Sequence, residues 1–61
     1  MIKAIEIDDT ESDYWACFEA LQYLEEQGHK VNYKSGTVFP TSDSERLQIL
    51  SRLDIMGIEH Y

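Results

Sequence analysis

The pattern of short apolar segments in this chain predicts a small α+β domain, in which two helices pack on one face of a three- or four-stranded, mainly antiparallel sheet. Three observations support this fold class. The 61 residues suffice for one compact domain over residues 1–61 and are too few for two. Hydrophobic residues make up 43% of the chain and charged residues 28%, as is typical of a folded protein. The spacing of apolar residues alternates along the chain between that of a strand and that of a helix, and it predicts elements in the order β-α-β-β-α. The last residues leave room for one more short strand.

The first predicted element is a strand over residues 2–7. It is rich in β-branched residues, and alternation places Ile5 and Ile7 on one face. Ile2 and Ala4 lie on the other face. Because both faces carry apolar side chains, we expect an inner strand that is partly covered on both sides.

A helix is predicted to follow, with Thr10 or Asp9 as its N-cap and Gly28 as the signal that ends it. Its apolar residues recur every three or four positions. The stripe that we expect to be buried is Tyr14, Cys17, Phe18, Leu21 and Leu24. Glu11 and Asp13 fall in the predicted first turn, where the positive end of the helix dipole favours a carboxylate by about 0.3 to 1 kcal/mol.

Residues 31–40 are predicted to form a hairpin whose register depends on its turn. A three-residue loop, Lys34-Ser35-Gly36, places Gly36 in the left-handed conformation that completes a type I turn with a G1 bulge. In that register Val31 pairs with Phe39, whereas a two-residue loop would turn Phe39 to the opposite face. We expect the three-residue loop. The side chains that then share a face are Val31, Tyr33 and Phe39.

A second helix is predicted after Pro40, because the segment Ser42-Asp43-Ser44-Glu45 matches a capping box. Gly57 is expected to end this helix. The residues expected to face the core are Leu47, Leu50 and Leu53, with Ile49 and Met56 widening the stripe. The tail, residues 58–61, can add one short edge strand.

The chain is strongly acidic, and the acid is concentrated in its first half. Twelve Asp and Glu residues against five Lys and Arg give a formal net charge of −7. Residues 28–61 are neutral, so the whole net charge belongs to residues 1–27, the first strand and the first helix. A surface of this sign repels a phosphate backbone and an anionic membrane, so we expect the protein to bind neither nucleic acid nor membrane directly.

Cysteine usage and the N-terminal residues bear on the compartment. Cys17 is the only cysteine, which excludes an intrachain disulfide and fits a reducing cytoplasm. The first residues reach an acid at Glu6 before any apolar run of signal-peptide length. No stretch approaches the roughly 18 apolar residues of a membrane span. We therefore expect a cytoplasmic protein.

No group of residues has the spacing of a catalytic, cofactor or metal site. Cys17 lies on an apolar stripe, where a thiol is unreactive, and it is not spaced with His29 and His60 as a zinc site requires. The acids at positions 9, 11 and 13 alternate as in a calcium loop, but Tyr14 and Ala20 stand where such a loop needs Gly and Glu. The glycines are too far apart for a phosphate-binding loop. The sequence thus indicates no enzyme and no cofactor.

The candidate partner-binding residues lie on a second stripe of the first helix: Glu11, Trp15, Glu19, Tyr23 and Glu26. At 100° per residue the centre of this stripe lies more than about 120° from that of the apolar stripe. Trp and Tyr are enriched in binding hot spots, and carboxylates between them favour a basic partner. The alternative interpretation is that Trp15 borders the core and Tyr23 packs on a neighbouring side chain.

These observations favour a small interaction module, which is an inhibitor or an adaptor. Its acidic half would dock on a basic surface of another protein, and a surface that binds nucleic acid is one such surface. In size and charge alone, without a shared motif, the chain resembles phage-encoded inhibitors of host or defence machinery, among them anti-CRISPR and anti-restriction proteins. A nucleic-acid mimic and an adaptor both need only oriented carboxylates, so both stay open. The alternative is a homo-oligomeric structural or accessory protein that uses its neutral half, residues 28–61.

Overall fold

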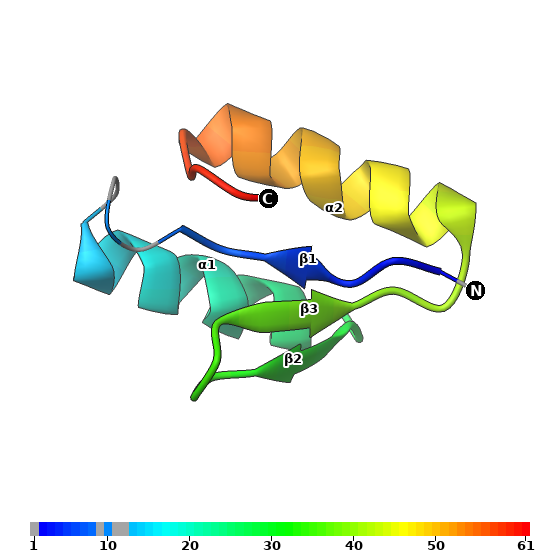
Figure 1. The fold of residues 1–61 in the computed structure, drawn as a ribbon, viewed down its shortest axis with the longest axis horizontal. Helices are drawn as coiled ribbons and strands as arrows, with labels where there is room; N and C mark the ends of the chain where they lie inside the picture. The colour runs from blue at the N-terminus through cyan, green and yellow to red at the C-terminus, as the bar shows by residue number, and fades with distance from the viewer. Residues whose placement is uncertain (1, 9, 11–12) are drawn as a thin grey trace.

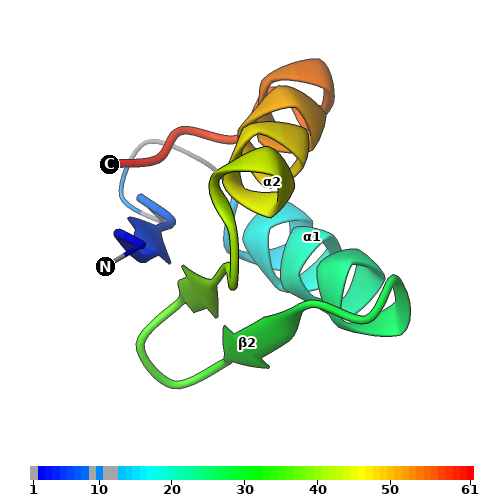
Figure 2. The ribbon, with the colours of Figure 1, turned by 90° about the vertical axis from the view of Figure 1, so that its right-hand side faces the viewer.

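Two helices cover one face of a three-stranded antiparallel sheet in the computed structural model, which describes residues 2–8, 10 and 13–61 (Figure 1, Figure 2). The elements are β1 (Ile5–Glu6), α1 (Tyr14–Glu26), β2 (Lys30–Asn32), β3 (Thr37–Phe39) and α2 (Asp43–Met56). The predicted α+β fold is therefore confirmed. The strand order is β1-β3-β2, so the inner strand is β3, whereas the sequence suggested that the first strand lies inside the sheet.

The core lies between the sheet and the two helices. Ile5 and Ile7 point into it from the same face of the first strand, as the alternation predicts. The buried hydrophobic residues are Ile5, Ile7, Cys17, Ala20, Leu21, Leu24, Val38, Ile49, Leu53 and Ile58. Within the described residues, no helix has both the length and the apolar character that a membrane-spanning segment needs.

The tail pairs with the chain just beyond β1. Ile7 forms an antiparallel bridge with His60, and the N–H of Asp8 donates to the carbonyl of Glu59 at 2.9 Å. The N–H of Tyr61 donates in turn to the carbonyl oxygen in β1 at position 6, at 2.8 Å. The edge strand predicted for residues 58–61 is thus reduced to one bridge, which lies next to β1 (Figure 1).

α1 begins later than the sequence suggested, because Asp13 is its N-cap. A side-chain oxygen of Asp13 accepts a hydrogen bond from the N–H of Trp15 at 2.9 Å. Thr10, one of the two caps expected, instead donates from its N–H and its hydroxyl to Oδ1 of Asp8, at 3.0 and 2.5 Å. The prediction of Thr10 is therefore wrong, because this local turn engages the residue before the helix starts. The other expected cap, Asp9, lies outside the described residues.

Asp13, one of the two acids expected in the first turn of α1, lies just before the helix. Asp13 precedes the helix as its cap, and the first turn itself contains no acid. Glu11 lies outside the described residues. The end of α1 is as predicted: Gly28 follows it with a φ of 96°, and the N–H of His29 donates back to the carbonyl of Leu24 at 3.0 Å.

The buried face of α1 is rotated away from the stripe predicted for it. Cys17, Leu21 and Leu24 are buried as expected, and Ala20 joins them. Tyr14 and Phe18 are exposed, so their assignment to the core is wrong. The apolar residues of α1 span an arc too wide for the sheet to cover, and the middle of that arc packs inward while the margin with Tyr14 and Phe18 stays in solvent.

The hairpin has a register one residue away from the predicted one. Val31 pairs with Val38 rather than with Phe39, and the loop contains the four residues 33–36. Asn32 sets this turn, because its Oδ1 accepts hydrogen bonds from the N–H groups of residues 34 and 35 at 2.9 and 3.3 Å. The carbonyl of Asn32 also accepts from Gly36 N at 2.9 Å.

The altered register decides which side chains of the hairpin enter the core. Val38 is fully buried, whereas Phe39 and Tyr33 are exposed. The prediction that Val31, Tyr33 and Phe39 share one face is therefore wrong. The left-handed conformation predicted for Gly36 is confirmed, with a φ of 66°.

α2 is bounded by the predicted signals. The hydroxyl of Ser42 accepts a hydrogen bond from the N–H of Glu45 at 3.1 Å, and Gly57 ends the helix in the left-handed region with a φ of 74°. The buried stripe of α2 is centred on other residues than the sequence predicts. Ile49 and Leu53 are fully buried and Leu50 is partly buried, but Leu47 and Met56 are exposed.

Glu45 joins the start of α2 to the end of α1. Its Oε2 lies 2.6 Å from Nδ1 of His29. Its Oε1 accepts hydrogen bonds from the N–H of Thr41 at 2.5 Å and from the Thr41 hydroxyl at 2.7 Å. The Thr41 N–H, followed by His29 and the Thr41 hydroxyl, lowers the pKa of Glu45 to about 2.

A group whose pKa is lowered by folding stabilises the protein only while it is ionised. We therefore expect Glu45→Gln to reduce the free energy of unfolding at pH 7, and the deficit relative to wild type to shrink as the pH falls from 4.5 toward about 2. Urea unfolding curves at several pH values in this range measure the difference. A deficit that is constant over the range would show that the Glu45 carboxylate is not responsible.

Candidate interaction surface

Three of the predicted binding residues lie together on the outer face of α1. Trp15, Glu19 and Glu26 are all exposed, and Trp15 is 68% exposed. At 100° per residue the three positions fall within about 40° of one another, on the side of the helix opposite its buried residues. The fourth predicted residue, Glu11, lies outside the described residues.

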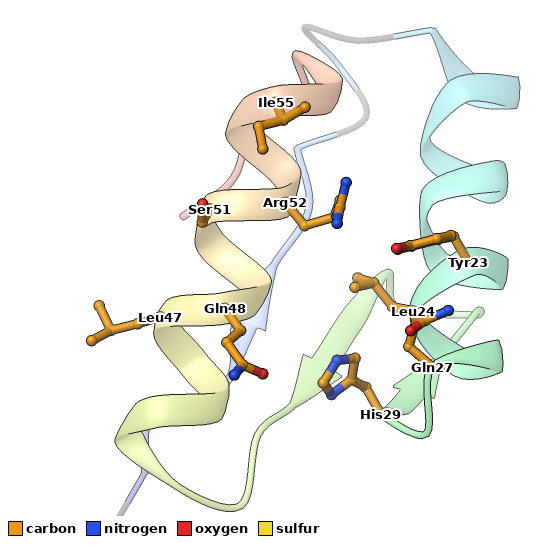
Figure 3. A pocket seen from close by; sticks show the side chains of 9 residues that line it. All are labelled: Tyr23, Leu24, Gln27, His29, Leu47, Gln48, Ser51, Arg52 and Ile55. Carbon is orange, nitrogen blue, oxygen red and sulfur yellow. The ribbon is translucent and has the colours of Figure 1, made fainter.

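Tyr23 belongs to a different side of α1. It is partly buried, packs against the core and faces α2, where the guanidinium carbon of Arg52 lies 5.2 Å from the centre of its ring. Figure 3 shows the two side chains directed toward each other across the space between the helices. The interpretation that Tyr23 packs on a neighbouring side chain is therefore confirmed.

Trp15 is part of an exposed aromatic cluster that the sequence did not predict. The members of this cluster are Tyr14, Trp15, Phe18 and Tyr33. Successive ring centroids are 5.7, 6.4 and 5.4 Å apart, and the first two pairs meet edge to face. All four rings are exposed, Tyr14 to 63%. The cluster joins the first half of α1 to the hairpin loop.

The aromatic cluster borders a hollow with a volume of about 440 Å³. Tyr14, Phe18 and Tyr33 line it from α1 and the hairpin, and the buried residues Ile7, Cys17 and Leu21 also line it. The rest of its rim is the loop over residues 34–36. A partner side chain that entered this hollow would therefore contact both apolar side chains and aromatic rings.

Glu25 holds the ring at the hairpin end of the cluster. The hydroxyl of Tyr33 donates to Oε1 of Glu25 at 2.8 Å. This hydrogen bond, followed by burial and the negative charges of Glu25 and Glu26, raises the pKa of Tyr33. The Tyr33 hydroxyl is therefore a neutral donor that ties the hairpin to α1.

The acids of α1 are placed against the preference of the helix dipole. α1 contains Glu19, Glu25 and Glu26 and no basic residue. Glu25 and Glu26 lie in its last turn, where the negative end of the dipole disfavours each carboxylate by about 0.3 to 1 kcal/mol. Glu25 is bonded to Tyr33, but within the described residues neither Glu19 nor Glu26 forms a hydrogen bond or ion pair through its side chain.

A second hollow, with a volume of about 550 Å³, lies between α1 and α2 (Figure 3). His29 is on its wall and is already paired with Glu45, while the other histidine, His60, lies 3.1 Å from Oδ1 of Asp54. In the part of the chain that the structure describes, no three His, Cys, Asp or Glu side chains gather as metal ligands would. Cys17, the free thiol, is buried in the core.

The sequence of α1 contains an indication of the exposed aromatic cluster, because its apolar side chains occupy an unusually wide sector of the helix surface. Counted at 100° per residue, apolar side chains extend over about 220° from Tyr23 to Phe18. A helix on one face of a sheet buries little more than 100° of its surface, so residues at a margin that no other element covers must be exposed. Tyr33 gave no such signal, because its exposure depends on the hairpin register.

Comparison of this chain with models of protein families, with curated proteins and with solved structures found no significant match.

Proposed function

We propose that this protein is an interaction module that binds a basic surface of another protein through the outer face of α1 and the exposed aromatic cluster. The observation that carries this proposal is the juxtaposition of four exposed rings with unpaired carboxylates on a helix without a base. Trp15 and Glu19 are one helical turn apart and therefore neighbours on the surface. Monomeric soluble proteins rarely expose contiguous apolar surface of this kind without a use for it.

The two kinds of residue have different roles in the proposed binding. The carboxylates of Glu19 and Glu26 attract a basic partner and increase the association rate. The rings supply apolar contact area at low cost in side-chain entropy, because each ring has only two rotatable side-chain bonds and is already packed on its neighbour. Once bound, Trp15 lowers the dissociation rate. A nucleic-acid-binding protein offers the basic surface that this arrangement fits, and occupation of that surface would inhibit it.

Charge reversal on α1 tests the proposal. The partner is first captured with the wild-type chain, and its affinity for each variant is then measured by surface plasmon resonance. Glu19→Lys combined with Glu26→Lys should weaken binding at least about tenfold, while wild-type binding itself weakens as the salt concentration rises. The melting temperature of the double variant should be equal to or above that of wild type, because lysine in the last turn of α1 complements the dipole.

A matched pair of variants separates local charge from net charge. Glu19→Gln with Glu26→Gln removes two negative charges from α1, and Ser44→Lys with Gln48→Lys adds two positive charges to exposed positions of α2. Both pairs change the net charge equally, but only the first should weaken binding strongly. If the Lys reversal binds as wild type does at every salt concentration, the acidic face of α1 is not the binding surface.

A further inference from the structure

The side of α2 that faces away from the core carries a row of three residues spaced four apart: Leu47, Ser51 and Ile55. Leu47 is 66% exposed and Ile55 is 72% exposed, more than any other aliphatic side chain in the described residues. Figure 3 shows the row along α2, with Leu47 directed away from α1. By contrast, Gln48 and Arg52 extend toward α1 (Figure 3). This row, the α2 row, is not part of the core or of the aromatic cluster.

The α2 row carries no charge in a chain whose net charge is −7. Three charged side chains of α2 lie beside the row: Arg52, which lies over the ring of Tyr23, Asp54, which is paired with His60, and Asp43, which is exposed one turn before Leu47. The positions that flank the row, Ser44 and Gln48, are polar and uncharged. Two copies of the chain therefore repel each other less across this side of α2, which belongs to the neutral half of the sequence, than across the acidic α1.

The α2 row is also symmetric about its middle residue. We propose that two copies of this chain associate through α2, antiparallel, about a two-fold axis at Ser51. This arrangement places Leu47 of each copy against Ile55 of the other, so the same contact is made twice, as an isologous interface requires. The small side chain of Ser51 lets the helices approach where they cross, and antiparallel helices bring dipole ends of opposite sign together.

A second copy fits this row better than the basic partner of α1 does. A basic surface is attracted by carboxylates, which the α2 row lacks, whereas a copy of the same chain offers an uncharged row with apolar side chains at both ends. A chain of 61 residues also has a thin core, and natural domains of this size often add stability by self-association. The proposal uses a different helix from the proposed function, so either can fail while the other holds.

Sedimentation equilibrium tests whether the dimer forms and where. With rising concentration, up to about 1 mM, the weight-average mass of the wild type should increase from the 7.1 kDa of the monomer toward twice that value. Leu47→Glu and Ile55→Glu should each raise the dissociation constant at least about tenfold. Gln22→Glu adds the same charge at an exposed position of α1 and should leave the dissociation constant unchanged. A wild type that stays monomeric would overturn the proposal and would leave the row to another protein. Glutamate variants that dimerise as wild type does would overturn it as well.

Disulfide cross-linking tests the two-fold axis itself. In an antiparallel pair centred on Ser51, the two copies of position 51 face each other, whereas the two copies of position 47 lie eight residues apart along the axis, about 12 Å at 1.5 Å per residue. Disulfide formation needs Cα atoms within about 7 Å. Ser51→Cys should therefore give at least about tenfold more covalent dimer than Leu47→Cys under the same oxidation. Equal yields would contradict the axis, and the buried thiol of Cys17 provides the background in both proteins.

Discussion

Leu21→Ala should lower the free energy of unfolding by about 2 to 5 kcal/mol, the usual range for removing a large buried aliphatic side chain. Leu21 is buried among the residues that α1 packs onto the sheet. A domain of this length has roughly 3 to 9 kcal/mol of stability in total, so the variant should be largely unfolded at 37 °C. Thermal melting followed by circular dichroism measures the loss.

Tyr14 provides the control for this substitution. It lies on the stripe that the sequence predicts to be buried, but the structure places it in solvent. Tyr14→Ala should therefore change the melting temperature far less than Leu21→Ala does. If the two variants lose stability equally, the orientation of α1 is wrong, and the exposed aromatic cluster with it.

Gly36→Val should destabilise the hairpin through its backbone conformation. Gly36 has a φ of 66°, in the left-handed region, which costs an ordinary L-residue about 1 to 2 kcal/mol and a β-branched one more. Space is not the limit, because a Cβ at this position would lie 3.8 Å from the carbonyl oxygen of Ile7, an ordinary contact. The loss should therefore follow the backbone preference of the new residue and not its size, and chemical denaturation can measure it.

Two further variants separate backbone strain from lost contacts. Gly36→Asn should cost less than Gly36→Val, because asparagine adopts the left-handed conformation more readily than other residues. Ser35→Ala removes the hydrogen bond from Ser35 to the hydroxyl of Thr37, at 2.8 Å, and should cost about 0.5 to 1.5 kcal/mol. Equal stability of the valine and asparagine variants would mean that the turn relaxes to another conformation.

The features that the sequence predicted correctly are those that depend on local chemistry. Ser42 caps α2 because its hydroxyl needs only the N–H three residues on, and Gly57 ends it because glycine accepts the left-handed region. The hairpin register also depends on local chemistry, but on two residues together. Gly36 alone predicts a three-residue loop, whereas the side chain of Asn32 accepts two N–H groups and makes the loop one residue longer.

The candidate interaction surface was predicted only in part, because some of its residues depend on contacts between elements. Trp15, Glu19 and Glu26 were placed correctly on the outer face of α1, because their position depends only on the helical repeat. Tyr23 was misplaced, because its environment depends on how closely α2 approaches α1. The ring of Tyr33 could not be assigned to the surface without the hairpin register, which places its centroid 5.4 Å from that of Phe18.

The pairing of residues 59–61 with residues 6–8 has a consequence for aggregation. An uncovered outer strand offers backbone N–H and C=O groups to any extended chain, and such strands are common starting points for intermolecular β-structure. Here the tail occupies that side of β1 with backbone hydrogen bonds of 2.8 and 2.9 Å. On the opposite side of the sheet, β2 is only three residues long and carries the exposed charge of Lys30. The two margins of the sheet are thus protected from intermolecular pairing by different means, one by a segment from the far end of the chain and the other by shortness and charge.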